Sequence, residues 1–103
     1  MPGRFNVRIT KSAERDIEEI WSFIASDDIE EAAKFVDKLE KQLRTLGAFS
    51  ERCPLIAENE ILGTRYRHLI CGNYRTIFKV SGRTVYVLRV IHAARLLERL
   101  VIE

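Results

Sequence analysis

The chain has 103 residues, 47% of them hydrophobic, and its 17 Lys and Arg against 15 Asp and Glu give a formal net charge of +2. These values fit one folded domain over residues 1–103 and argue against a disordered chain. No apolar run approaches the ~20 residues of a membrane span, and the first residues lack a signal-peptide core, so we expect a cytoplasmic protein without a membrane partner. Cys53, Cys71, His68 and His92 have no metal-ligand spacing, which predicts reduced thiols and neither a metal nor another cofactor.

The first half of the chain predicts a strand followed by a helix. Residues 5–9 alternate between apolar and polar side chains, as a half-buried strand does. An apolar stripe at helical spacing then predicts a helix that begins at an N-cap, Thr10 or Ser12. We expect Trp21 and Phe23 on this helix to lie in the core.

A second apolar stripe predicts another helix of about five turns. It starts after Asp28, which has the spacing of a capping box with Glu31, and Gly47 is its candidate C-cap. Because only two or three residues separate the two helices, we expect an antiparallel helical hairpin.

Residues 48–63 show no steady period and predict a loop whose acidic residues, Glu51, Glu58 and Glu60, lie in solvent. Two-residue turn signals separate the apolar runs that follow. They predict an antiparallel meander of three strands over about 64–71, 74–80 and 83–91.

The last predicted strand is apolar on both faces, so we place it inside the sheet, beside the N-terminal strand. Alternation assigns its two faces as Val85, Val87 and Ile91 against Tyr86, Leu88 and Val90. On the middle strand, Arg75 is expected on the face away from the helices. A slip of one residue exchanges the faces of a strand, which leaves open the faces of Arg65, Arg67 and Arg89.

The order β-α-α-β-β-β predicts an α+β fold, in which the helical hairpin packs on one face of a curved, mainly antiparallel sheet. Residues 95–100 are expected to form a short C-terminal helix or tail.

Charge is distributed unevenly along the chain. Residues 1–60 contain 9 Lys and Arg against 13 Asp and Glu, a net charge of −4, whereas residues 61–103 contain 8 against 2, a net charge of +6. Taken singly, Arg65, Arg67 and Arg89 are expected to be structural or solubilising, but together in a basic sheet they suit an anionic or acidic partner. The candidate target-binding residues are Arg65, Arg67, Arg75, Arg89 and Arg95.

The order of elements, the Asn73-Tyr74-Arg75 opening of the middle strand and the run from Leu88 to Arg95 together resemble the RelE/ParE superfamily. Its members are the toxins of bacterial type II toxin–antitoxin systems. The resemblance implies growth inhibition, a role of the kind that stabilises plasmids, and a cognate antitoxin whose acidic, partly disordered segment wraps the toxin.

Within this superfamily, RelE-like members cut mRNA on the ribosome, and ParE-like members inhibit DNA gyrase without a known hydrolytic site. A RelE-like activity would make the chain an endoribonuclease. Arg75 and Arg95 would then hold phosphate, and His92 would supply acid–base catalysis. In the ParE-like case the chain is not an enzyme.

Two departures favour the ParE-like branch. The segment 58–60 is acidic where the RNA-cutting members carry lysines, and residues 96–103 lack the tyrosine that those members place after the last arginine. We therefore expect a ParE-like inhibitor of DNA gyrase. A RelE-like ribosome-dependent mRNA endoribonuclease and a plain nucleic-acid-binding α+β module stay as alternatives.

Overall fold

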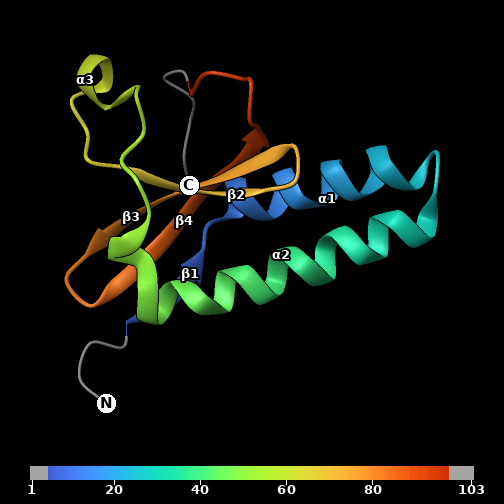
Figure 1. Cartoon of the computed structure of the whole chain (residues 1–103), viewed down its shortest axis with the longest axis horizontal. Helices are drawn as coiled ribbons and strands as arrows, with labels where there is room; N and C mark the ends of the chain where they lie inside the picture. Colours follow the sequence, from blue (N-terminus) through green and yellow to red (C-terminus); the bar gives the residue numbers. More distant parts are fainter. Residues whose placement is uncertain (1–4, 98–103) are drawn as a thin grey trace.

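A computed structural model describes residues 5–97 (Figure 1). Its elements follow the predicted order β-α-α-β-β-β, with two short helical turns between the second helix and the second strand. They are β1 (Asn6–Ile9), α1 (Lys11–Ala25), α2 (Ile29–Phe49), η1 (Ser50–Arg52), α3 (Asn59–Leu62), β2 (Arg67–Cys71), β3 (Tyr74–Ser81) and β4 (Thr84–His92). The α+β class is confirmed, and the two short turns lie in the segment predicted to be a loop.

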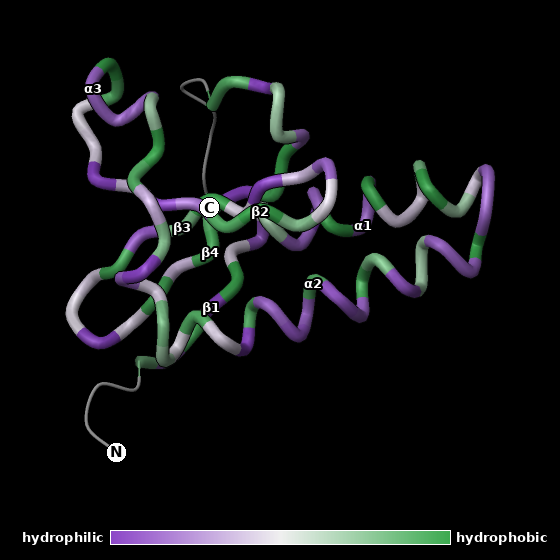
Figure 2. The backbone as a smooth tube through the Cα atoms, in the orientation of Figure 1, coloured by the Kyte–Doolittle hydropathy of each residue, from purple (hydrophilic) through white to green (hydrophobic). Residues whose placement is uncertain are grey.

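Side-chain caps fix where the two long helices begin. The Thr10 hydroxyl accepts a hydrogen bond from the Ala13 N–H at 3.2 Å and caps α1, whereas Ser12 lies inside the helix and is buried. The Asp28 carboxylate accepts hydrogen bonds from two backbone N–H groups of the first turn and caps α2. The expected helical hairpin is present, and Figure 2 shows α2 banded between hydrophilic and hydrophobic residues, as an amphipathic helix should be.

Gly47 does not end α2, contrary to the prediction. The helix continues to Phe49, and Gly47 lies where the helix touches the chain just before β1. The Phe5 N–H donates to the Gly47 carbonyl at 2.7 Å, and a Cβ on residue 47 would lie 2.8 Å from the Phe5 carbonyl oxygen. This glycine therefore permits a close backbone approach.

The four strands lie in the order β1-β4-β3-β2. β1 pairs with β4 in parallel, and the other neighbours are antiparallel, so β4 is an interior strand beside the N-terminal strand as predicted. The helical hairpin covers one face of this open mixed sheet, as Figure 1 shows.

Each face of the sheet has its own apolar cluster. The helix-facing cluster joins α1 and α2 to the strands through Ala13, Ile20, Leu39, Leu43, Leu46, Cys71, Phe78, Val85, Val87 and Val90. The opposite cluster consists of Ile56, Ile77, Ile91 and Leu97, with Leu62 and Tyr66 packed against it. Residues before β2 and after β4 thus cover the second face of the sheet.

A β-bulge changes the faces of β4. The register with β3 shifts in mid-strand, and Leu88 is left as the extra residue. Because the faces exchange past a bulge, Val87 and Val90 both join the helix-facing cluster, whereas Ile91 joins the opposite one. The predicted grouping of Ile91 with Val87 is therefore wrong.

Trp21 and Phe23 are not core residues, contrary to expectation. They are 38% and 73% exposed. At about 100° per residue along a helix, they lie on either side of the stripe that Ala13, Ile20 and Ile24 direct at the sheet. The C-terminal segment is a turn and irregular chain from Ala93 to the last described residue, and the rest of the helix or tail expected over residues 95–100 lies outside the described residues.

Candidate functional site

The five candidate arginines fall into two groups in the structure. Arg65 and Arg95 are exposed. Arg67, Arg75 and Arg89 have internal partners, and the guanidinium of Arg67 donates to a backbone carbonyl at 2.6 Å. The sequence charge pattern therefore overstates the number of cations that face solvent on this sheet.

Arg89 joins the sheet to the helical hairpin. Its Nε and Nη2 donate to the two carboxylate oxygens of Asp16 at 2.6 and 2.9 Å, and the Val90 N–H donates to the same carboxylate at 2.9 Å. The hydrogen bonds that Arg89 donates to Asp16 raise the pKa of the Arg89 guanidinium. The Nε and Nη2 side of the guanidinium is thus matched to a carboxylate of α1.

Arg75 points away from the helices, as predicted, but it is buried. Its guanidinium forms a bidentate ion pair with Glu58, with side chains only 6% and 9% exposed. Its Nη2 also donates to the Arg95 carbonyl at 2.7 Å, and its Nη1 lies 3.3 Å from Nδ1 of His68.

Glu58 is therefore not a solvated loop acid, contrary to the prediction. Apolar side chains on both sides of it in sequence, Ile56 and Leu62, pack on the second face of the sheet and carry Glu58 inward with them. The Leu97 N–H donates to its Oε2 at 2.8 Å. No local sequence period signals this burial, because the partners lie on β3 and in the C-terminal segment.

Two side chains next to the Arg75 guanidinium, Glu58 and His68, have pKa values below their ordinary ones. Hydrogen bonds from Arg75 outweigh the opposing effect of burial and lower the pKa of Glu58 to about 2. Burial, with a further contribution from Arg75, lowers the pKa of His68. Glu58 is thus a carboxylate at neutral pH.

His92 and Arg95 line a cleft of about 310 Å³ where β4 ends beside α1. Other walls of the cleft include Phe23 and Tyr74, and the His92 ring meets Tyr74 edge to face, with centroids 5.6 Å apart. Nδ1 of His92 lies 3.2 Å from the Ala94 N–H and accepts its hydrogen bond. The structure thus brings together two of the three candidate catalytic residues.

The third candidate catalytic residue does not reach that cleft. Arg75 is absent from the lining, and its terminal nitrogens are occupied by Glu58 and the Arg95 backbone. The three residues proposed for RNA cleavage therefore do not share one open surface in this structure.

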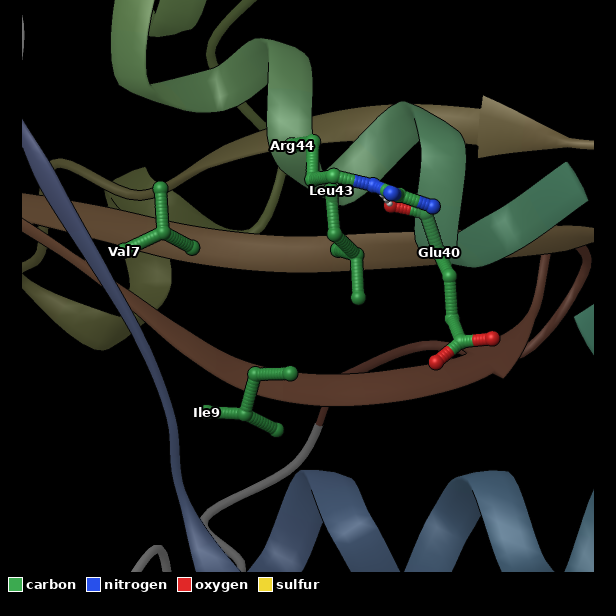
Figure 3. A pocket seen from close by; sticks show the side chains of 5 residues that line it. All are labelled: Val7, Ile9, Glu40, Leu43 and Arg44. Atoms are coloured by element: carbon green, nitrogen blue, oxygen red, sulfur yellow. Dashed lines mark hydrogen bonds between the residues drawn. The ribbon is translucent and has the colours of Figure 1, made fainter. Parts of the chain in front are cut away.

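A second hollow, of about 360 Å³, lies between the edge strand β1 and α2. Figure 3 shows the side chains of Val7, Ile9 and Leu43 around it, with Glu40 and Arg44 projecting from α2 at its rim. Sequence reasoning missed this hollow, although the alternation over residues 5–9 had already identified the apolar face of β1.

Among residues 5–97, no strand pairs with the outer edge of β1. Asn6 and Thr10 donate their N–H groups to β4 and the residue before it, so alternation directs the N–H and C=O groups of Val7 and Ile9 toward the open edge. The exposed cations that line hollows beside β1 are Arg8, Lys11 and Arg44.

Within residues 5–97 no group of three or more His, Cys, Asp or Glu side chains is placed to hold a metal ion. Both cysteines, Cys53 and Cys71, are free thiols whose pKa burial raises. No helix in the described part of the chain is both long enough and apolar enough to cross a membrane.

Comparison with solved structures defines the class to which this fold belongs. One structure of a chromosomal ParDE toxin–antitoxin system from P. aeruginosa matches with a TM-score of 0.70 and 20% identity, over 87% of this chain and 97% of that one. The toxin–antitoxin complex RelBE2 from Mycobacterium tuberculosis matches with a TM-score of 0.56 and 24% identity, over 92% and 98%. The arrangement of hairpin and sheet is thus the fold found in these two toxin–antitoxin structures.

Sequence comparison gives the family within this class. The family of the ParE toxin of the type II toxin–antitoxin system parDE matches residues 7–97. The chain belongs to this family and is a ParE-like toxin of the type II class. No curated protein sequence matches the chain significantly.

Proposed function

We propose that this toxin arrests growth by poisoning DNA gyrase in the cytoplasm and that a cognate antitoxin neutralises it. Membership of the ParE family supports this proposal over the RelE-like alternative. The structural observation that carries the choice is the buried ion pair between Glu58 and Arg75.

RNA cleavage needs a cation at the scissile phosphate and acid–base groups within reach of the same atoms. Arg75 has no exposed donor for a phosphate, because its two terminal nitrogens bond to Glu58 and to the Arg95 carbonyl, and its Nε is buried. His92 and Arg95 alone form an incomplete nuclease site. An inhibitor that acts by binding needs no such constellation.

A gyrase cleavage assay tests the target directly. Purified toxin with gyrase and supercoiled plasmid should give linear DNA after protein denaturation, in proportion to toxin concentration. In a translation extract programmed with mRNA, the same toxin should leave the mRNA intact. Cleaved mRNA with unaffected gyrase would instead establish the endoribonuclease. A gel-mobility shift of nucleic acid, with neither gyrase trapping nor mRNA cleavage, would establish a simple binding module.

For the antitoxin, we infer that an extended acidic segment adds to the open edge of β1. The edge offers the backbone groups of Val7 and Ile9, and the adjacent hollow accepts apolar side chains between them and Leu43. The cations around this edge would attract carboxylates, and a neighbouring hollow of about 450 Å³ includes Arg8 and Lys11.

Co-expression of the toxin with the product of the adjacent gene tests this surface. One stable complex should elute from size exclusion, and Ile9→Asp should weaken it by placing a carboxylate at the edge. The matched control is Ile70→Asp, since Ile70 is an exposed isoleucine on the other edge strand, β2. Equal effects of the two substitutions would exclude the β1 edge.

A further inference from the structure

The C-terminal segment after β4 is fastened by a buried ion pair that belongs to other parts of the chain. The Arg95 carbonyl accepts a hydrogen bond from Nη2 of Arg75 at 2.7 Å, and the Leu97 N–H donates to Oε2 of Glu58 at 2.8 Å. One residue of β3 and one residue just before α3 therefore hold two points of the segment, separated by a single residue.

The ion pair and the segment depend on each other. Oε2 of Glu58 accepts from both Arg75 and the Leu97 N–H, and Nη2 of Arg75 donates to both Glu58 and the Arg95 carbonyl. If residues 95–97 moved away, each of the two charged groups would lose one hydrogen-bond partner. The segment thus supplies an acceptor to Arg75 and a donor to Glu58.

Apolar packing fixes the same segment. Leu97 is 4% exposed and packs with Ile56, Ile77 and Ile91 on the second face of the sheet. Leu96, between the two anchored backbone groups, is 68% exposed. The anchors therefore turn the Leu96 side chain outward, next to the exposed guanidinium of Arg95.

We propose that Glu58 and Arg75 are positioning residues, whose ion pair holds residues 95–97 so that Arg95 and Leu96 form a preformed contact for the toxin's protein target. A guanidinium beside an exposed leucine fits a patch that offers a carboxylate next to an apolar side chain. Preorganisation of such a contact reduces the ordering cost of binding. This inference rests on the proposed function, which supplies the protein target.

We call the ion pair of Glu58 and Arg75, together with the residues 95–97 that it holds, the clamp. Hydrogen exchange tests the clamp without a measurement of activity. In Glu58→Gln the side-chain amide presents donors to a site that needs an acceptor, so the Leu97 amide should exchange at least about tenfold faster. Amides of the sheet centre, such as those of Phe78 and Val87, should keep their protection. The matched control is Glu60→Gln, a neighbouring exposed acid, which should change nothing. Unaltered exchange at Leu97 in Glu58→Gln would overturn the proposal.

Gyrase trapping tests the consequence of the clamp. Glu58→Gln should require about tenfold more toxin to trap gyrase, whereas Arg95→Ala should require about 30-fold more and leave Leu97 exchange unchanged. Arg75→Lys keeps the positive charge but cannot form the bidentate hydrogen bonds of the guanidinium. Its Leu97 exchange rate and its gyrase trapping should both lie between those of the parent and Glu58→Gln. A loosened segment with full trapping activity would overturn the proposal.

If Glu58→Gln does not fold, Leu97→Ala loosens the same segment without leaving a buried charge unpaired. Loss of trapping in a folded Leu97→Ala protein supports the proposal, and full activity overturns it. Failure of the parent toxin to trap gyrase would count against the proposed target, whereas the exchange measurement on Leu97 would still decide whether the clamp exists.

Discussion

Asp16 on α1 and Arg89 on β4 are separated by 73 residues in sequence, yet their side chains form two hydrogen bonds, of 2.6 and 2.9 Å. The Asp16 carboxylate also accepts the Val90 N–H. The side chains are only 10% and 13% exposed, which distinguishes the pair from the exposed ion pairs along α2. It therefore fixes how the hairpin sits on the interior strand of the sheet.

Removing Asp16 should destabilise the fold. We expect Asp16→Ala to lower the free energy of unfolding by about 3–5 kcal/mol, because Arg89 would stay largely buried without its partner. Urea unfolding followed by circular dichroism measures this change. Glu18→Ala, at an exposed position of the same helix, should stay within about 0.5 kcal/mol of the parent, and equal effects of the two would mean that the pair contributes nothing.

Arg75 should behave as a structural residue. We expect Arg75→Ala to cost about 3–5 kcal/mol in the free energy of unfolding, since Glu58 would lose its counter-charge inside the protein. Arg83→Ala is the control, because Arg83 is exposed beside the turn between β3 and β4. A melting temperature of Arg75→Ala equal to that of Arg83→Ala would show that the pair does not stabilise the fold.

Acid should unfold the protein partly through Glu58. The folded-state pKa of about 2 lies below the ordinary value of 4.5, so its contribution to stability is complete above about pH 4.5 and is lost as the pH falls toward 2. The parent should lose about 3 kcal/mol more than Glu58→Gln across that interval, at 1.36 kcal/mol per pKa unit. Parallel curves of unfolding free energy against pH would contradict this expectation.

Local patterns predicted much of this fold. Helical periodicity, caps at Thr10 and Asp28, and the two-faced apolar last strand gave the helical hairpin, the interior place of β4 and the side of the sheet to which Arg75 points. Each of these features depends on residues close together in sequence, or on the number of faces that a strand must bury.

The rest depended on contacts between distant segments. The burial of Glu58 requires β3 and the C-terminal segment as partners, and no pattern near residue 58 shows them. The bulge at Leu88 reverses the faces of β4 through one unpaired residue, which alternation alone does not show. For the same reason the candidate site contains fewer free arginines than the charge count suggested.

Gly47 should not tolerate a side chain. At an exposed helical position, Gly→Ala stabilises by about 1 kcal/mol through helix propensity. We expect Gly47→Ala to destabilise instead, by about 1–3 kcal/mol, because its Cβ would press on the Phe5 carbonyl and push β1 away from α2. Ala48→Gly at the neighbouring exposed position gives the propensity baseline. A rise in the unfolding midpoint of Gly47→Ala would show that β1 shifts freely.

The two exposed candidate arginines should differ in function. Arg95 borders the cleft that includes Phe23 and His92, and the exposed Leu96 follows it, whereas Arg65 lies before β2 outside this cleft. We expect Arg95→Ala to weaken gyrase trapping about 30-fold, the loss of roughly 2 kcal/mol typical of an interface arginine, and Arg65→Ala to weaken it less than about threefold.

The melting temperature distinguishes a loss of target binding from a loss of folding. Both guanidinium groups are exposed, so neither substitution should change the melting temperature. Arg95→Lys sharpens the test: a carboxylate held by both arms of the guanidinium would be held less well by a lysine, so activity should fall partway. If Arg65→Ala lost as much activity as Arg95→Ala, the target would lie along the whole basic half of the sheet. Full activity in both variants would move the target-binding surface away from the arginines altogether.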